Sequence, residues 1–542
     1  MFDDSSRLAR WCSTLWFPVL TILVLGMVAH GHALRATFFM DDALHITGEH
    51  NILDHFGGWM EREFRWLPSL IWERTAAAVG YSAPAFHAWT LGTHLLIGAL
   101  LFPFSTALLA RIAPGLKHQR SIAWCAALLF VCHPLTTEPV HYARCFMIDL
   151  VTLFTMLSAW SFLRWWDCRS WRNFGLLLAM VSLAMVSKQP GVLHALGVVG
   201  ILAVTQMPWR KELGRLFIHH PRVAWGVIVG FGIALAWVPW GHHRLFGQPQ
   251  FIPNVLTQTR VFWEYAALLF VPVGQSVDHL RAWTTDPRDP AFLLAATALL
   301  IGTGGAVWGV IRFPSFRPVA ILLALGLWAV FLRFLYVSPE TMVEYRMYPA
   351  MPFLSIALGW GLWRLAQLPW RGMRYAVPVI LLALTTLSWQ RSVQWTEATT
   401  LAASAAQTQP ENLRALGSLQ YAASQKGNFQ AAVQLKPFAD EALANLLQHN
   451  ETHRWRKHEI SRPHLWYETF LRHHVAAIAN LQGPEIAFAQ AETYLATLRE
   501  EYPNFYPRRN SIHHPLLDYR NRLEAYLCEQ SELHHELSAV HP

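Results

Sequence analysis

Long apolar segments separated by short polar loops constrain this chain more than any other feature of its sequence. A helix that crosses a membrane needs about 20 consecutive, mainly apolar residues. Such runs recur up to residue 392 and predict about eleven membrane-spanning helices. Their predicted ranges are 13–34, 86–110, 120–138, 146–164, 173–188, 190–207, 222–241, 290–311, 318–337, 349–367 and 374–392. The predicted fold class is therefore all-α, a polytopic membrane protein.

The composition agrees with this prediction and argues against a nucleic-acid partner. Of the 542 residues, 53% are hydrophobic and 14% are charged, which is typical of polytopic membrane proteins. The net charge of +8 has a simpler origin than nucleic-acid binding, because much of the Lys and Arg lies in short loops between spans. The first apolar segment lacks a small-residue cleavage site and is followed by further spans, so we interpret it as a retained signal anchor. The six cysteines show no metal-ligand spacing.

Alternate loops separate by charge, which predicts the orientation of the chain in its membrane. Loops rich in Lys and Arg stay in the cytoplasm. The basic set contains Arg7 and Arg10; Arg111, Lys117 and Arg120; Arg164, Arg169 and Arg172; Arg210, Lys211, Arg215 and Arg222; Arg312 and Arg317; Arg371 and Arg374. The acidic set contains Asp41, Asp42, Glu49, Glu61, Glu63, Glu138, Asp278, Glu340 and Glu344. We therefore expect a multi-pass protein, of a bacterial inner membrane, with a cytoplasmic amino terminus and a periplasmic carboxy-terminal domain.

The sequence predicts two domains. Residues 1–392 form the transmembrane domain, with outer loops at 35–85, 133–145, 242–289 and 338–348. Segment 261–273 is too short to cross alone and ends near a proline, so we interpret it as a re-entrant or interfacial helix. Residues 393–542 are polar and helical in pattern, and segment 410–447 has the spacing of a tetratricopeptide (TPR) helix pair. A second apolar-periodic stretch, 475–498, would pack beside it. Solvated surface histidines explain the His-rich end of the chain better than a metal site does.

An adjacent pair of carboxylates, Asp41 and Asp42, lies just beyond the first apolar span. Acidic side chains at a membrane boundary are costly unless they face a cavity, a partner or a ligand. On the outer side such a pair could deprotonate an acceptor or hold a cation. An exposed pair that caps the next helix is the structural alternative.

Further polar residues collect in the other outer loops. A cavity lined by carboxylates and fixed cations could deprotonate an acceptor and stabilise a departing phosphate. Arg and Lys at a membrane boundary suit a lipid-linked phosphate, since the guanidinium binds phosphate in a bidentate manner. Each loop alone has a structural alternative: Lys188 could snorkel to the interface, Glu138 could cap a helix, and Arg346 could pair with Glu344. These residues are Arg65, His133, Glu138, Arg144, Lys188, Glu344, Arg346 and Tyr348.

At these residues the chain resembles the polytopic GT-C glycosyltransferases, specifically the lineage with carboxy-terminal TPR repeats typified by the TMTC-type O-mannosyltransferases and their bacterial relatives. Asp41-Asp42 stands at the position of that lineage's acidic pair. The other matching segments are Phe64-Arg65-Trp66-Leu67, Phe86-His87 with His94, His133-Pro134 through Glu138, Ser187-Lys188, and Val343 through Pro349. The chain departs from the family pattern at Trp66, Gln189 and Ala143-Arg144-Cys145-Phe146, and its repeats are few.

The resemblance implies a polyprenyl-phosphate-linked sugar donor, an acceptor outside the cytoplasm and inversion at the anomeric carbon. It implies that Asp41 or Asp42 accepts or orients the acceptor proton, with Asp41 narrowly favoured, and that Glu138 and His133 assist. It assigns the donor phosphate to Lys188 and Arg346 together with Arg65 and Arg144, with Glu344 and Tyr348 in support. Some members use a divalent cation, Mg²⁺ or Mn²⁺, which the acidic pair could hold.

Two other readings of the sequence stay open. A transferase that modifies lipid or polysaccharide would use the same site, although a TPR-like domain favours an exported protein acceptor such as a pilin, because helical repeats offer a concave binding surface. A transporter of lipid-linked sugar would place its ionisable residues near the midplane, in repeated halves. No convincing internal duplication is present, and the charges lie at loop edges.

Overall fold

The computed structural model describes most of the chain as helices. The described residues are 16–39, 42, 46, 65–206, 251–279, 281, 283–338, 340–368, 375–452, 463–501 and 515–540. The predicted span 222–241 lies outside these ranges, as do Asp41 and most of the first outer loop. Within them every regular element is helical, and the one bridge between extended residues joins His279 to Met342. The predicted all-α class is confirmed for this part of the chain.

The chain divides into two units, which are described separately. The first comprises Met1–Gln275, Ala282–Val337 and Val343–Thr396. The second comprises Ser276–Arg281, Ser338–Met342 and Glu397–Pro542, so two short segments from between the apolar helices belong to it.

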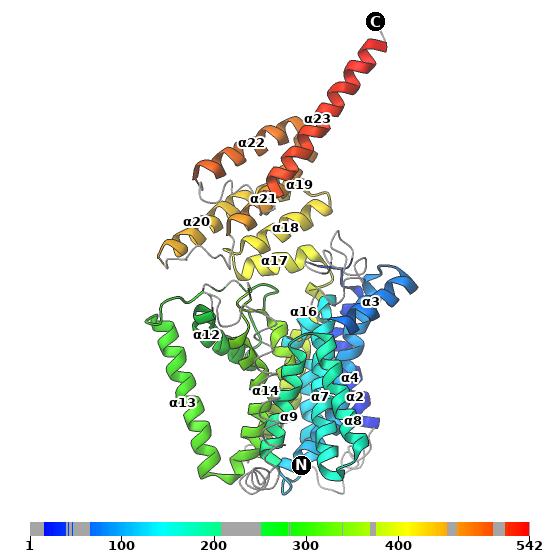
Figure 1. Cartoon of the computed structure of the whole chain (residues 1–542), viewed down its shortest axis with the longest axis vertical. Helices are drawn as coiled ribbons and strands as arrows, with labels where there is room; N and C mark the ends of the chain where they lie inside the picture. The colour runs from blue at the N-terminus through cyan, green and yellow to red at the C-terminus, as the bar shows by residue number, and fades with distance from the viewer. Residues whose placement is uncertain are drawn as a thin grey trace, which may run out of the picture. The chain divides into compact units, whose positions relative to one another are not determined.

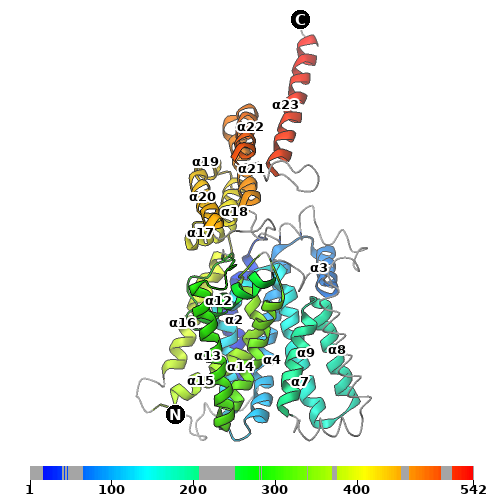
Figure 2. The ribbon, with the colours of Figure 1, turned by 60° about the vertical axis from the view of Figure 1, so that its left-hand side comes forward.

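The first unit is a bundle of apolar helices. In Figures 1 and 2, α7, α8 and α9 run side by side, and each packs on the other two. The described helices are α2 (Trp16–His30), α3 (Trp66–Val79), α4 (Ala83–Ile112), α5 (Gln119–Cys132), α6 (Thr137–His141), α7 (Phe146–Cys168), α8 (Trp171–Ser187), α9 (Gly191–Gln206), α12 (Phe251–Phe270), α13 (Pro290–Arg312), α14 (Arg317–Leu335), α15 (Met351–Ala366) and α16 (Ala376–Gln394), with short 3-10 turns between some of them.

Length and apolar composition qualify six described segments as candidate membrane spans. A seventh forms if α5 and the segment Pro134–His141, which are bent by 57° at their junction, act together. The chain is thus a multi-pass membrane protein, while the predicted total of eleven spans is not confirmed. Helix α12 is longer than the predicted interfacial segment 261–273 and is not among the candidate spans.

The centre of this unit is formed by α5 and α7. Nearly every residue of α5 from Ile122 to Cys132 is buried, because the helix is apolar on all sides and is surrounded by α2, α4 and α15. Gly359 of α15 permits one of these contacts: a Cβ there would lie 2.9 Å from the backbone nitrogen of Ala126. Small residues allow such close helix approach in membranes, where burial of apolar surface gives little driving force between helices. Helix α13 lies at the periphery, where only 6% of its most apolar stretch is buried.

The second unit is a stack of helices with its own core. Helices α17 to α22 lie one on another in both views (Figures 1 and 2). The helices are α17 (Ala398–Thr408), α18 (Leu413–Gln425), α19 (Phe429–Gln434), α20 (Lys436–Thr452), α21 (Pro463–Gln482), α22 (Pro484–Glu501) and α23 (Pro515–Val540). Their shared core includes Leu416, Leu443, Phe470, Val475 and Leu495.

The predicted helix pair in segment 410–447 forms as two capped helices. Asn412 caps α18 and Asn428 caps α19, each through its side-chain oxygen. Between them Gly427 adopts a φ of 75°, which is costly for any residue with a Cβ and explains the glycine. The structure places helices at the predicted positions, and the TPR character of this region stays a prediction.

Candidate functional site

The His-Pro motif bends the chain and brings Glu138 to the site. Pro134 lacks an amide hydrogen, so α5 ends at Cys132 and a 3-10 turn, η4 (Pro134–Thr136), begins. His133 fixes the turn from both ring nitrogens. Its Nδ1 accepts the amide of Leu135 at 3.1 Å, and its Nε2 lies 3.0 Å from the carbonyl oxygen of Leu269. Helix α6 follows immediately and carries Glu138, which is buried.

Glu138 holds the segment that carries three of the predicted site residues. Its Oε2 accepts the backbone amide of Tyr345 at 2.8 Å, across 207 positions of sequence. That amide opens the 3-10 helix η7 (Glu344–Ala350), which includes Glu344, Arg346 and Tyr348. The predicted motifs at 133–138 and 343–349 are therefore in direct contact.

Gln275 joins the same two segments a second time. Its side-chain nitrogen donates to Oε2 of Glu344 at 2.7 Å and to the carbonyl oxygen of Pro134 at 3.0 Å. Glu344 is buried, so this hydrogen bond replaces water that the carboxylate has lost. An amide can serve a carboxylate and a carbonyl at once because its nitrogen carries two hydrogens.

Lys188 occupies the tip of a tight hairpin between α8 and α9. Gly191 closes the turn by donating to the carbonyl oxygen of Lys188 at 2.7 Å. A Cβ on Gly191 would lie 1.9 Å from the carbonyl oxygen of Ala184, so only glycine permits this approach. The lysine ammonium then lies 5.6 Å from the ring centre of Tyr345, and the guanidinium carbon of Arg346 lies 5.7 Å from the same ring. Two cations thus share one aromatic ring.

Three of the predicted phosphate-binding cations act on the fourth, Lys188. Burial, together with the positive charges of Arg65, Arg346 and Arg144, lowers the pKa of Lys188 to about 7, and Cys145 acts in the opposite direction. Crowding of this kind disfavours the charged lysine until an anion arrives. A lysine so perturbed in a membrane protein is typical of a functional site.

Asp42 is buried and bound to the backbone of the next predicted motif. Its two carboxylate oxygens accept the amide of Ala143 at 3.1 Å and the amide of Arg144 at 2.7 Å. These bonds hold the turn η5 (Ala143–Cys145) that carries Arg144. Asp41 lies outside the described residues.

The described residues give no support for a cation site at Asp42, and Asp41 lies outside them. Both of its oxygens are directed at backbone amides, and the described part of the chain contains no group of three or more His, Cys, Asp or Glu side chains that could hold a metal ion. We therefore derive no step through a divalent cation.

Tyr348 extends the site into the bundle. Its hydroxyl lies 2.8 Å from Nδ1 of His94, and both side chains are buried. The ring of His94 in turn lies 5.0 Å from the ring of His30, measured between centres. Helices α2 and α4 and the segment η7 are thereby linked by side-chain contacts.

Sequence patterns missed Arg391, a buried cation near the acidic residues. It lies in the last turn of α16 and is close enough to Glu344 and Glu138 to interact with both charges. An arginine at the end of an apolar run is costly in a membrane and could have signalled a role. Gln275 was missed too, because a single glutamine in a loop gives no pattern.

Comparison with known proteins identifies the class of the chain. The model of the dolichyl-phosphate-mannose-protein mannosyltransferase family matches residues 90–250, a range that contains His133, Glu138, Arg144 and Lys188. This match supports a polytopic glycosyltransferase of the GT-C type. No curated protein and no solved structure matches it.

For a membrane glycosyltransferase this arrangement supplies one kind of group that the reaction needs, fixed positive charge. Breaking a bond to an anomeric carbon leaves negative charge on the departing group, which fixed cations stabilise. The chain gathers three further cations around Lys188. Glu138 accepts the backbone amide of Tyr345, next to Arg346, and Glu344 accepts the side-chain nitrogen of Gln275.

Proposed function

We propose that this glycosyltransferase moves a sugar from a polyprenyl-phosphate donor to a hydroxyl group of an exported protein, with inversion at the anomeric carbon. The observation that carries the proposal is the group of four cations, Arg65, Arg144, Lys188 and Arg346, at residues within or next to the GT-C motifs. A donor that ends in a lipid-linked phosphate matches such a group in charge. The positive-inside pattern supports placing the reaction on the extracytoplasmic side, with the amino terminus in the cytoplasm.

The cations act on the donor. The bond between the anomeric carbon and the phosphate oxygen breaks, and its electron pair leaves with the polyprenyl phosphate. Lys188 and Arg346, both near the Tyr345 ring, stabilise that charge, and Arg65 and Arg144 complete the phosphate site. The gain is largest in the transition state, where the charge on the phosphate increases.

Asp41 acts on the acceptor. It takes the proton of the acceptor hydroxyl while that oxygen attacks the anomeric carbon. We favour Asp41 over Asp42 as the base because both oxygens of Asp42 already accept backbone amides. Asp42 then serves by fixing the turn that carries Arg144, and Glu138 serves by fixing Tyr345 and thus Arg346.

Donor use is expected to weaken as the pH rises through about 7. The free enzyme has a Lys188 pKa lowered to about 7, so the lysine is charged below that pH and neutral above it. Since kcat/KM reports the free enzyme, kcat/KM for the donor should fall about tenfold for each pH unit above the pKa if the charged lysine is required. Lys188→Arg should flatten this profile, because arginine stays charged throughout the range.

The matched control is Lys117→Arg, on an exposed turn away from the site. This control should keep the wild-type profile. An unchanged pH dependence in Lys188→Arg would assign the fall in activity to another group.

The proposed function is tested by mass spectrometry of exported proteins from cells with and without the chain. Loss of a hexose or pentose from serine or threonine of an exported protein, restored by the wild-type chain but not by Lys188→Ala, is the expected result. The pilins of a piliated host are the first fraction to examine. A glycan lost from lipid or polysaccharide, with protein glycans intact, would indicate that the acceptor is a lipid or polysaccharide rather than a protein. An unchanged glycan profile together with lipid-linked sugar trapped on the cytoplasmic side would indicate a transporter.

A further inference from the structure

Six consecutive residues, from Glu340 to Tyr345, are each fixed by a different partner just before the cationic segment. Thr341 donates to the carbonyl oxygen of Arg281 at 3.1 Å, and the remaining contacts follow along the chain. Met342 pairs with His279, the Tyr265 hydroxyl donates to the carbonyl oxygen of Val343 at 2.9 Å, Glu344 accepts Gln275, and Tyr345 donates to Glu138. Glu340 begins the series, within 3.6 Å of Arg414. A contact at every residue of 340–345 holds this loop in one position.

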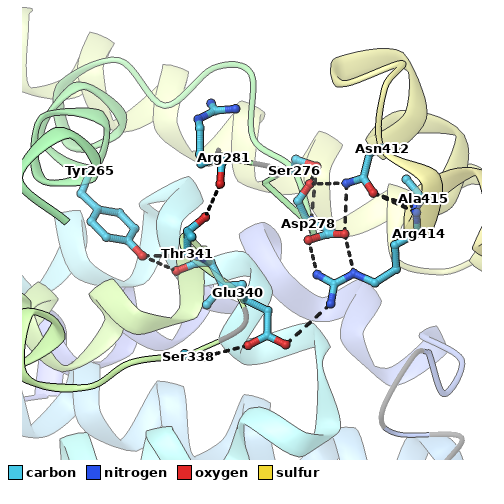
Figure 3. A network of polar contacts seen from close by, with 11 residues as sticks. Tyr265, Ser276, Asp278, Arg281, Ser338, Glu340, Thr341, Asn412, Arg414 and Ala415 are labelled. Carbon is cyan, nitrogen blue, oxygen red and sulfur yellow. Dashed lines mark hydrogen bonds and ion pairs between the residues drawn. The ribbon is translucent and has the colours of Figure 1, made fainter. Parts of the chain in front are cut away.

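Arg414 joins the two short segments of the second unit to each other (Figure 3). Its Nε donates to Oδ2 of Asp278 at 2.7 Å, and its Nη2 donates to Oδ1 of the same carboxylate. Its Nη1 faces Glu340 at 3.6 Å. One guanidinium therefore binds Asp278 in a bidentate manner and reaches the neighbouring segment with its remaining nitrogen.

Asn412 supplies the second part of this contact. Its side-chain nitrogen donates to the carbonyl oxygen of Asp278 at 3.1 Å and to Oδ2 at 3.0 Å. Its side-chain oxygen meanwhile accepts the amides of Arg414 and Ala415 as the cap of α18. Asn412 and Asp278 are both buried. The start of α18 cannot shift without breaking the contact to Asp278.

Both segments continue directly into the site. Asp278 lies three positions after Gln275, which binds Glu344, and Glu340 lies six positions before Arg346. We propose that Arg414 and Asn412 are positioning residues of the glycosyltransferase, which hold the segments 276–281 and 338–342 so that Arg346 is correctly placed for the donor phosphate. The inference rests on the proposed function. It gives the start of α18 a task in the reaction that is separate from acceptor recognition by the tail.

The expected effect follows from the geometry. Arg414→Ala leaves the buried carboxylate of Asp278 without its guanidinium and removes the ion pair with Glu340, so the loop before Arg346 loosens. A displacement of about 1 Å at a reacting group can reduce a rate by about a hundredfold. Because the site itself is intact, we expect a smaller change: a rise of about tenfold in the donor KM, with the acceptor KM unchanged.

The test uses the full chain in detergent or nanodiscs, with Arg414→Ala, Arg414→Lys and the control Arg520→Ala, which removes a comparable ion pair with Glu492 and Glu524 elsewhere in the second unit. Two quantities are measured: the donor KM with polyprenyl-phosphate mannose, and amide hydrogen exchange of segments 276–281 and 338–348. Arg414→Ala should raise both, Arg414→Lys should restore part of each, and Arg520→Ala should change neither.

Outcomes separate this inference from the proposed function. Wild-type levels of donor KM and of exchange in Arg414→Ala would overturn the positioning role. Faster exchange with an unchanged donor KM would also overturn it, leaving a purely structural contact. Absence of transfer in the wild-type chain would reject the proposed function, while the exchange measurement would still decide whether Arg414 holds the two segments. If Arg414→Ala fails to fold, Glu340→Gln provides the milder test, since it removes only the longer of the two ion pairs.

Discussion

Lys188→Ala is expected to reduce sugar transfer by about a hundredfold or more, with the folded protein retained. The ammonium faces the ring of Tyr345 beside Arg346, at the tip of a hairpin whose backbone bonds do not use the side chain. A charge-assisted bond to a phosphate contributes about 1.5–3 kcal/mol, and its contribution increases as charge develops on the leaving group. The measurement is the initial rate at saturating and at limiting donor, which separates binding from chemistry.

The stability of this variant distinguishes a catalytic role from a structural one. Burial and neighbouring cations lower the Lys188 pKa to about 7, so the charged lysine is disfavoured in the unliganded protein. Below pH 7 Lys188 is charged in the folded protein, although the charged form is more favourable in the unfolded protein. Removing it should therefore leave stability unchanged or raise it at acidic pH. Loss of folded protein in Lys188→Ala would contradict this, and Lys117→Ala, on an exposed turn, should change neither stability nor rate.

Long-range apolar patterning made the membrane bundle predictable. Segments such as 86–110 and 290–311 correspond to α4 and α13 because a run of apolar residues in a helix records burial in lipid or protein directly. The total number of membrane spans could not be predicted from the lengths of these apolar runs. Helices α8 and α9 are short, and α5 continues into a bent segment, so run length alone does not say whether each crosses.

The site was only partly predictable, for a different reason. His133, Glu138, Lys188 and Arg346 could be singled out because they lie in short motifs at the ends of apolar runs. Their partners could not, since Gln275 and Arg391 lie far away in sequence and belong to no motif. Nor does sequence distinguish an acid that faces a ligand from one that holds a backbone turn, as the amide bonds of Asp42 show.

The acidic pair is expected to divide into one reacting and one structural residue. Asp42→Asn should lower both the folded yield and the rate, because an asparagine presents its NH₂ group to one of the two amides that Asp42 now accepts. A buried charge-assisted bond of this kind is worth about 1.5–3 kcal/mol, so a loss of about 2–4 kcal/mol in the free energy of unfolding is expected. Asp41→Asn should instead keep the fold and lower the rate by about a hundredfold or more, the range for loss of a general base.

Thermal unfolding in detergent, together with initial rates at saturating donor, separates the two variants. Asp167→Asn serves as the control, because that carboxylate is 55% exposed and pairs with Arg111 at the end of α7, away from the acidic pair. A stable but inactive Asp42→Asn would transfer the role of base to Asp42. Full activity in Asp41→Asn, with the fold intact, would exclude Asp41 as the base. If both variants remained active, proton removal would have to come from Glu138 or from solvent, and the cations around Lys188 would carry most of the catalysis.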